Sequence, residues 1–416
     1  MPIWPGSIAS CGSICRASSC RSRSAHTLGL RQIHTGGTNP IRPPLRVAGD
    51  YTLQASLDLT RLCPRAVLRC ILAMGLAAGQ EGRIGELPVI ESPEAMVCGT
   101  LVADIRVQPF VPIGPWARAS VRRVESIRML PGGIVANTGL ALARLGIKTG
   151  LIGRLGHDAI GDVLLAAFRD AGLGVEHLRR MPDVPTAPVI VCVDPAGERT
   201  SHYAEGASTL FDRGDLEVAL PSLRQARAIV IGYLNELPHL DPELVETLAW
   251  LKRESGALVV LETAGPQELQ HAALQELLKS VDVFVPSWVE ARDLTDARTP
   301  HAALTRIVAL APSGTLLGIK LGAAGCLARL GGRICRIPAY PSVVRDATGA
   351  GDSFLAGVVA GLLRGCDPAT AIRLGNMAGA LTVAAIEGHA ALPPFEELLG
   401  RVAEHNYTVA REKRTV

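Results

Sequence analysis

The stretch RDATGAGDSFLAGVVAGLLRG, residues 345–365, places small residues and an acid directly before an apolar helical pattern. Apolar residues after Asp352 recur at spacings of three and four, which predicts a helix that begins near Ala350 or Gly351. The first turn of a helix carries unpaired N–H groups and a partial positive charge, and Gly349 and Gly351 would let an anion approach the backbone. Asp352 is then either a helix-stabilising acid or a base beside a bound phosphate, and this stretch alone does not decide between the two.

The composition is that of a globular protein, with 48% hydrophobic residues and a net charge of +3 over 416 residues. Aromatic residues make up only 4% of the chain, which argues against a nucleic-acid surface. No apolar run reaches the ~18 to 20 residues that a membrane span requires. The ten cysteines lack metal-binding or redox spacing, and Cys192 is predicted to be a buried strand residue in a reducing compartment. We therefore expect a cytoplasmic protein without nucleic-acid or membrane partners.

Residues 1–93 are set apart as an N-terminal extension. The first 37 residues are rich in Ser and Arg and contain no acid, as in an organelle transit peptide. The alternative is that the start codon was assigned too far upstream, because Met74 and Met96 both stand before the recognisable folding pattern. We favour this alternative. One folded unit is predicted over 94–405, followed by a frayed charged tail, 406–416.

Strands and helices alternate regularly after Met96, which predicts an α/β fold with three α/β/α layers around a mostly parallel sheet. The stretch MVCGTLVADIRV is predicted to contain a strand that is followed by an acid, with Asp104 at the end of the strand. The stretches APVIVCVD and ERTSHYAE are predicted to form a hairpin, and residues 105–130 do not fit the alternation and are predicted to form a small β-sheet lid. The further expected strands are 149–156, 228–233, 258–263, 281–286 and 315–322, and the expected helices include 135–145, 161–173 and 242–256.

Other phosphate and nucleophile motifs are missing from the sequence. GTLLGIKLG has the wrong spacing for a Walker loop, and GRLGHDAIG lacks the dinucleotide fingerprint and is predicted to be a strand-to-helix turn. Ser353 does not sit in a nucleophile elbow. A phosphate would therefore need some other arrangement.

Four blocks in order resemble the ribokinase-like, or PfkB, family of carbohydrate kinases, and the likeness runs over residues 96–400. The blocks are PGGIVANTGLALARLG, GERTSHYAEGAS, VDVFVPSWVEARDLTD and DATGAGDSFLAG. The resemblance implies that the backbone of Gly349, Ala350 and Gly351 forms an anion hole for a γ-phosphoryl group, and that Asp352 accepts the proton of the attacking sugar hydroxyl.

The resemblance also assigns the sugar-binding and nucleotide-binding positions. Read alone, Asp104 could be a surface acid, Asn137 a helix-start residue and Glu290 a solvated helix acid. By family likeness, Glu290 would help to organise Mg²⁺ and phosphate. The implied sugar-binding residues are Asp104, Gly132, Gly133 and Asn137, and the implied nucleotide-binding residues are Lys320, Gly322, Gly325 and, at the adenine, Asn376.

The chain departs from the family pattern at several positions. Ser287 replaces a usual Asn, and Ser208 replaces the Asn of a common GAN motif. Val102 and Ile134 replace polar residues that ribokinases use on the sugar, which argues against ribose. Asp346 and residues 387–390 lie where some members hold a monovalent cation, and whether K⁺ activates this chain cannot be read from its sequence.

The sequence therefore predicts an ATP-dependent, Mg²⁺-requiring kinase for a hydroxyl group of a small sugar or sugar acid. One alternative is a nucleoside kinase of the same fold, for which Phe110, Trp116 or Tyr203 could supply a shelf for the base. The other is a catalytically silent sugar-binding regulator. The lid is a candidate for homodimer formation with a second copy of the chain.

Overall fold

The computed structural model describes residues 92–111, 123–195, 199–265, 269, 271–386, 388–405 and 410–411. All of these belong to the unit Arg83–Val416. The predictions for residues 1–91, for Trp116 and for most of the tail lie outside the described residues.

The main sheet confirms the predicted mostly parallel arrangement. Its strand order is β14-β13-β12-β11-β10-β9-β8-β1-β4-β5, and the pairs from β5 to β11 are parallel, whereas β11 to β14 are antiparallel. The hairpin β12–β13 and the strand β14 had not been identified from the sequence. The strands are β1 (Ala95–Gly99), β4 (Thr149–Gly156), β5 (Gly174–Met181), β8 (Ala228–Leu234), β9 (Leu258–Thr263), β10 (Val283–Phe284), β11 (Leu316–Lys320), β12 (Cys326–Leu330), β13 (Arg333–Ile337) and β14 (Ala410–Arg411).

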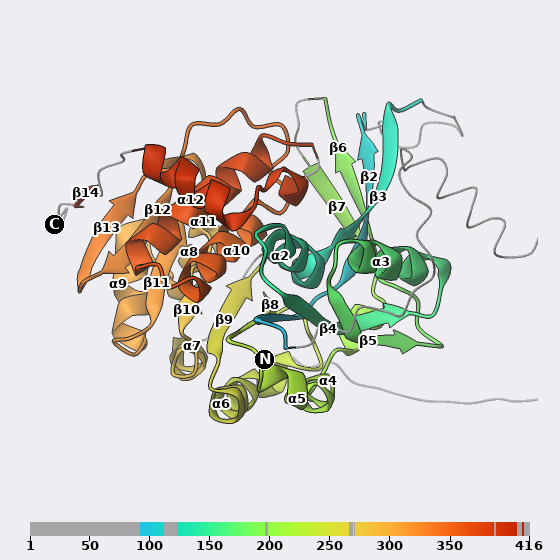
Figure 1. Cartoon of the computed structure of the whole chain (residues 1–416), viewed down its shortest axis with the longest axis horizontal. Helices are drawn as coiled ribbons and strands as arrows, with labels where there is room; N and C mark the ends of the chain where they lie inside the picture. The colour runs from blue at the N-terminus through green and yellow to red at the C-terminus, as the bar shows by residue number, and fades with distance from the viewer. Residues whose placement is uncertain are drawn as a thin grey trace, which may run out of the picture. The chain divides into compact units, whose positions relative to one another are not determined.

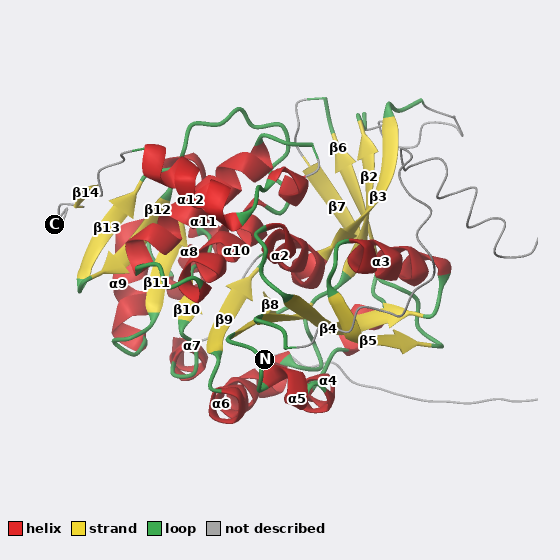
Figure 2. Cartoon of the chain, viewed as in Figure 1, coloured by secondary structure: helices red, strands yellow, loops and turns green. Residues whose placement is uncertain are grey.

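Helices cover both faces of this sheet (Figures 1 and 2), as the three-layer prediction requires. In β1, Ala95 and Val97 point into one core, while Met96 and Cys98 point into the other, so the strand is apolar throughout. The first core contains α2 (Gly133–Arg144), α3 (Ala159–Asp170), α10 (Ala350–Leu363), α11 (Pro368–Val383) and α12 (Phe395–Glu404). The second contains α4 (Arg213–Val218), α5 (Leu220–Leu223), α6 (Leu244–Ser255), α7 (His271–Leu278), α8 (Trp288–Thr295) and α9 (Pro300–Leu310). Short 3₁₀ turns are η2 (Ala207–Leu210), η3 (Asp241–Glu243), η4 (Gly322–Ala324) and η5 (Gly388–Ala391).

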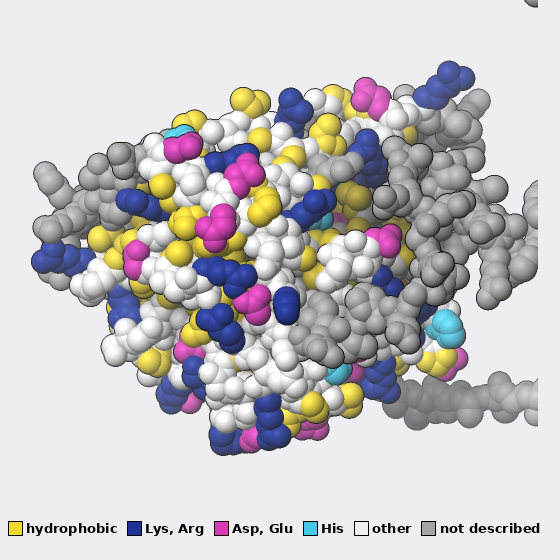
Figure 3. All heavy atoms as spheres, in the orientation of Figure 1, with side chains coloured by type: hydrophobic (Ala, Val, Ile, Leu, Met, Phe, Trp, Pro, Cys, Tyr) yellow, Lys and Arg dark blue, Asp and Glu magenta, His cyan; other side chains and the backbone are white. Residues whose placement is uncertain are grey.

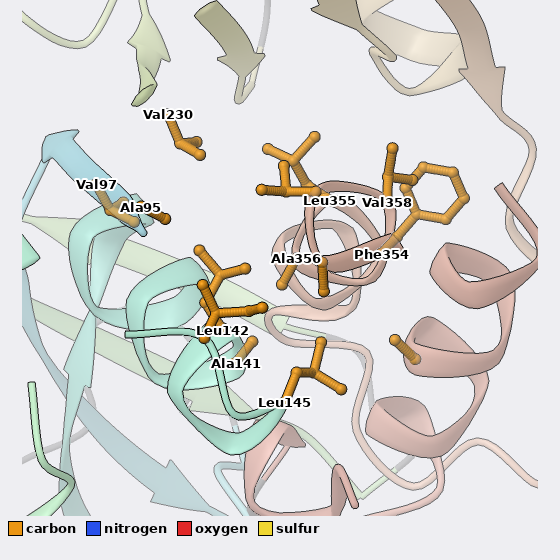
Figure 4. Close-up of a cluster of buried hydrophobic side chains, with 14 of the residues drawn as sticks. Ala95, Val97, Ala141, Leu142, Leu145, Val230, Phe354, Leu355, Ala356 and Val358 are labelled. Atoms are coloured by element: carbon orange, nitrogen blue, oxygen red, sulfur yellow. The ribbon is translucent and has the colours of Figure 1, made fainter. Parts of the chain in front are cut away.

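Helix α2 packs against α10 and against β1 and β8 (Figure 4). Leu142 of α2 and Leu355 of α10 belong to the same buried cluster as Val97 and Val230 of the strands. On its other side α10 meets α11 so closely that a Cβ on Gly357 would lie 2.8 Å from the Leu374 carbonyl oxygen. This burial fixes the N-terminal turns of α2 and α10 relative to each other.

The lid is a separate four-stranded sheet of order β3-β2-β6-β7, with β2 (Val102–Gln108), β3 (Ser126–Gly132), β6 (Pro188–Val193) and β7 (Arg199–Tyr203). The prediction of one strand from Met96 to Asp104 is wrong, because the chain leaves the main sheet after β1 and enters the lid as β2. At Gly99 the φ angle is 125° and a Cβ would lie 1.7 Å from the Gly232 carbonyl oxygen, so only glycine fits this exit. The predicted hairpin is confirmed as the antiparallel pair β6–β7, and it forms part of the lid.

The remaining general predictions can be compared with the described residues. Cys98, Cys192, Cys326 and Cys335 are buried in strands, whereas Cys366 is only half-buried after α10. None of the helices in the described part of the chain has the length and apolarity that crossing a bilayer requires. The face in Figure 3 shows basic and acidic side chains interspersed.

Candidate active site

Asp352 lies in the first turn of α10 and is only 8% exposed. The Tyr233 hydroxyl donates a hydrogen bond to its Oδ1 at 2.7 Å, and Thr138 Oγ1 approaches the same oxygen at 3.3 Å. Asn137 Nδ2 donates to Oδ2 at 3.3 Å. Because Oδ1 takes the short bond, Oδ2 is the oxygen better placed to accept a proton from a substrate.

Opposing effects set the basicity of this carboxylate. Burial raises the pKa of Asp352, while the bonds from Tyr233, Thr138 and Asn137 and the charge of Lys320 lower it, and the net pKa is raised. A carboxylate that is buried, oriented and made more basic in this way can act as a general base.

The N-terminus of α10 has the geometry of an anion site. Gly349 is its N-cap residue in the left-handed region at φ 70°, and no side chain caps the helix there. A Cβ on Gly351 would lie 3.4 Å from Lys320 Nζ, so the ammonium group of Lys320 stands beside the first turn. The Ala350 N–H makes a long bond of 3.4 Å to the Ala347 carbonyl oxygen. The remaining N–H groups that a helix start offers, the helix dipole and this ammonium group together favour a phosphoryl group.

Lys320, at the end of β11, forms a buried ion pair with Glu262 at the end of β9. Burial alone would lower the pKa of Lys320, but the nearby carboxylates of Glu262, Glu290 and Asp352 raise it, so the side chain stays charged. Glu262 is 3% exposed, and its Oε2 has no hydrogen-bond partner. The ion pair therefore holds a lysine near the anion site together with an unsatisfied carboxylate oxygen.

Glu290 is only 9% exposed, which excludes the alternative of a solvated helix acid. Ser287 N-caps α8, and the Oε2 of Glu290 accepts bonds from the Ser287 N–H and the Thr263 hydroxyl, each at 2.7 Å. Ser287, where the family pattern has Asn, thus forms a capping box that orients Glu290. Both bonds fall on Oε2, which leaves Oε1 as an oxygen ligand of the kind that Mg²⁺ prefers.

Asp104 lies within β2 of the lid, and not at the end of the first strand of the main sheet as predicted. Burial raises its pKa to about 6, the charge of Arg106 opposes this shift, and the charge of Asp352 adds to it. A Cβ on Gly132 would lie 2.6 Å from Asp104 Cγ, and therefore the glycine makes room for this carboxyl group. Gly133, at φ 79°, would place a Cβ 2.4 Å from the Thr100 carbonyl oxygen.

The structure brings the Asn137 amide to the Asp352 carboxylate. Val102 and Ile134 are both buried. Ser208 is buried, and its hydroxyl accepts a bond from the Leu101 N–H at 2.9 Å, so it stabilises the connection from β1 to the lid.

Apart from Lys320, the residues predicted to bind the nucleotide are Asn376, Gly322 and Gly325, and in this structure they lie at or hydrogen-bond to loop segments. Asn376 donates from Nδ2 to the carbonyl oxygens of Ile337 and Pro338, at 3.1 Å each, so its amide is already used. Gly325, at φ 88°, allows the β11–β12 turn to approach Ile337. Gly322 is in the left-handed region with open space at its Cβ position.

Sequence reasoning missed Tyr233, Thr138 and Glu262. Tyr233 and Glu262 lie near the carboxyl ends of apolar strands, where sites in open α/β sheets are built, and this position was a usable signal. Thr138 follows Asn137 directly and could have been included with it.

The comparisons with known proteins agree with this geometry. The profile described as "pfkB family carbohydrate kinase" matches residues 94–393. The chain is 29% identical over 280 residues to a ribokinase of Haemophilus influenzae, covering 66% of this chain and 88% of that one. It is 32% identical over 300 residues to an aminoimidazole riboside kinase of Salmonella typhimurium, covering 67% and 90%.

Solved structures show the same fold. An Arabidopsis thaliana ribokinase complexed with ribose and ATP superposes with a TM-score of 0.62 at 23% identity, covering 76% of this chain and 100% of that one. A Burkholderia thailandensis nucleoside kinase in complex with inosine gives 0.59 at 22% identity, covering 76% and 99%. With the buried acid, the glycine-lined helix start and the family match over most of the folded unit, the chain belongs to the pfkB family of carbohydrate kinases and is a phosphotransferase.

Proposed function

We propose that the protein transfers the γ-phosphoryl group of ATP to a hydroxyl group of a small sugar or sugar acid. The observation that carries this proposal is the position of Asp352, which is buried at an uncapped helix N-terminus with Oδ2 toward Asn137 of α2, the helix whose N-cap residue Gly132 faces Asp104. Such a carboxylate can take a proton from a hydroxyl group at the point where a phosphoryl group would be bound.

Each residue has a distinct part in this reaction. Asp104 would accept hydrogen bonds from sugar hydroxyl groups and hold the acceptor against Asp352. Asp352 Oδ2 would take the proton of the attacking hydroxyl group. The N–H groups at Gly349 to Gly351 and the ammonium group of Lys320 would stabilise the negative charge of the phosphoryl group.

The side chains present fit ATP and Mg²⁺. Glu290, through Oε1, would hold Mg²⁺ directly or through water, and the buried unpaired Oε2 of Glu262 is a second oxygen in the same neighbourhood. The metal ion supplies charge neutralisation on the phosphates when it is bound. A protein site with few carboxylates suits Mg²⁺, which keeps several waters and phosphate oxygens as ligands.

A coupled ADP-release assay over a panel of sugars, sugar acids and ribosides tests this proposal. Wild type should turn over at least one compound, and Asp352→Asn should lower kcat by ~10² to 10⁴. The control is Asp367→Asn, the same change at the N-cap residue of the next helix, α11. Asn also caps helices well, so this variant should keep its activity. Turnover that Asp352→Asn leaves intact would overturn the assignment of the base.

A nucleoside kinase is the second candidate, and the 32% identity to an aminoimidazole riboside kinase favours keeping it. Phe110 and Tyr203, two of the aromatic residues suggested as a base shelf, are 36% and 45% exposed on the lid. Preference for ribosides over free sugars in the same panel would select this candidate.

We propose that turnover does not require K⁺. The Arg106 guanidinium binds the Asp346 carboxylate and approaches the Ile386 carbonyl oxygen at 3.4 Å, so a positive charge already occupies the neighbourhood of Asp346. Equal rates in KCl and in tetramethylammonium chloride are expected. A rate that rises by more than ~10-fold with KCl would contradict this, because a factor of ten corresponds to about 1.4 kcal/mol of transition-state stabilisation.

We also propose that the lid forms a homodimer. Its outer face carries Ile127, Met129 and Ile190, which are 65%, 37% and 43% exposed. Met129 and Ile190 flank Ile105 in one row across the sheet, whereas Asp104 and Arg106 point to the opposite face. An apolar sheet face of this kind is typical of an interface.

Sedimentation of Ile127→Glu tests the dimer. The variant should sediment as a monomer where wild type sediments as a dimer. Val218→Glu is the control, because Val218 is 76% exposed on α4 and lies outside the lid. Identical sedimentation of wild type and Ile127→Glu would contradict the assigned interface.

A further inference from the structure

Arg106 connects the lid to the turn before the anion site. It lies on β2, is 7% exposed, and binds the Asp346 carboxylate 240 residues further along the chain. It also approaches the carbonyl oxygen of Ile386, which follows α11. Asp104 lies two residues earlier on the same strand, so both side chains are on the same face of the lid.

Asp346 in turn shapes the approach to Gly349. Its Oδ2 binds Arg106, while its Oδ1 accepts bonds from the Thr348 N–H at 2.9 Å and from the Thr348 hydroxyl at 2.7 Å. The backbone N–H groups of Arg345 and Asp346 both donate to the Val383 carbonyl oxygen. Asp346 therefore holds the turn 346–348 that leads directly into the helix N-cap.

A second lid arginine reaches the same turn from a different strand. Arg199 of β7 donates to the Thr348 hydroxyl and lies 3.8 Å from the Asp346 carboxylate. Its side chain is 34% exposed, compared with 8% for that of Arg106. Arg106 is therefore the more shielded member of the pair, and water cannot readily replace its bond to Asp346.

The burial of this ion pair determines what its loss would do. The Asp346 side chain is 12% exposed, and without Arg106 its charge would keep only the Thr348 bonds and the more exposed Arg199 at 3.8 Å, so the carboxylate would be destabilised where it stands. The turn would then rearrange so that Asp346 reaches water, and the N-cap residue Gly349 would move with it. The positions of the anion site and of the lid are linked by this contact.

Building on the proposed function, we propose that Arg106 is a positioning residue that holds the turn 346–348, and with it the anion hole, in place from the lid. Asp104 and Arg106 then act together. The first binds the acceptor, and the second fixes the phosphoryl site from the same strand. Sugar binding and formation of the anion hole are coupled through β2.

Hydrogen exchange and kinetics of Arg106→Met test this proposal, because methionine keeps most of the aliphatic stem. Without ligand, amide exchange in the segment 345–353 should rise at least ~10-fold, since local opening is controlled by such contacts. Exchange in β9 should stay unchanged, which excludes global destabilisation. Arg106→Lys should give an intermediate rate, and Arg253→Met, which removes an exposed arginine of α6, should match wild type.

Kinetics supply the second readout. With the best substrate of the panel, Arg106→Met should lower kcat by at least ~10-fold. Couplings between binding sites commonly change affinity by ~5- to 150-fold, and in Arg106→Met sugar should change the affinity for ATP by less than about 2-fold. Arg106→Lys should recover part of kcat. Unchanged exchange over 345–353 in Arg106→Met would overturn the proposal whatever its activity. Faster exchange together with an Asp352→Asn variant that keeps full activity would leave this contact supported and refute the proposed base.

Discussion

Replacing Tyr233 with Phe removes one hydroxyl group that touches the proposed base. The hydroxyl donates to Asp352 Oδ1 at 2.7 Å, the shortest of the three bonds to this carboxylate. Phe keeps the ring and therefore the packing, so the change isolates the hydrogen bond. Thr138 Oγ1 stays on the same oxygen at 3.3 Å, and Asn137 stays on the other.

The magnitude follows from the charge of the acceptor. A hydrogen bond to a charged group contributes ~1.5 to 3 kcal/mol, and one pKa unit corresponds to ~1.4 kcal/mol. The bond favours the ionised form of Asp352 and lowers its pKa, so its removal should raise the pKa by ~1 to 2 units. The base must be ionised to act, and the acidic limb of the rate profile should move to higher pH by the same amount.

The assay is kcat/KM for the best substrate measured by ADP release across pH, for wild type and Tyr233→Phe. On the high-pH plateau the two rates should agree within ~10-fold, because Asn137 and Thr138 still hold the carboxylate. Tyr203→Phe is the matched control on the lid, and it should leave the limb in place. An acidic limb that does not move in Tyr233→Phe would show that the hydroxyl does not tune the base.

Three further predictions concern the sugar and phosphate sides of the site. The pKa of Asp104 is raised to about 6, so the carboxylate gains a proton as the pH falls through 6 and accepts hydrogen bonds less well. The KM of the wild type for sugar should therefore rise below about pH 6. Asp104→Asn should have a high KM for sugar that does not depend on pH in this range. Gly132→Ala would place a methyl group 2.6 Å from Asp104 Cγ and should raise the KM for sugar, with a cost of ~1 to 3 kcal/mol for overpacking, measured by sugar titration at saturating ATP. Lys320→Met should lower kcat by ~10² to 10³, and it should also lower the melting temperature because Glu262 is left unpaired; the double variant Lys320→Met with Glu262→Gln should recover the melting temperature and not the rate.

Much of the site was readable from local patterns. The period of three to four after Asp352 predicted a helix start near Ala350 or Gly351, and α10 begins at Ala350. The same reasoning predicted α2 and most strands of the main sheet, because apolar periodicity reports which side of an element is buried. The glycines at 349 and 351 were identified because a close approach to backbone leaves few alternatives.

Local patterns failed where the chain changes sheets. Apolar residues dominate on both sides of Gly99 and Thr100, so periodicity could not show that β1 ends at Gly99 and that β2 enters the lid. The consequence was functional, since Asp104 belongs to the lid strand and its position depends on how the lid lies. The strand predicted over residues 281–286 is also too long, since β10 has only the two residues Val283 and Phe284. Val281 and Val285 are buried as well, so the apolar pattern of a strand extends beyond its hydrogen-bonded part.

The amino-acid sequence by itself determined the chemistry that is available: an acid at a helix start, glycines around it, and an alternation that builds a three-layer sheet. Only the tertiary structure decided which groups tune that acid and what links the lid to it. Tyr233 lies 119 residues from Asp352, and Arg106 lies 240 residues from Asp346. Such pairs depend on how β8, β2 and α10 pack, and packing is a property of three-dimensional contacts that no local spacing encodes.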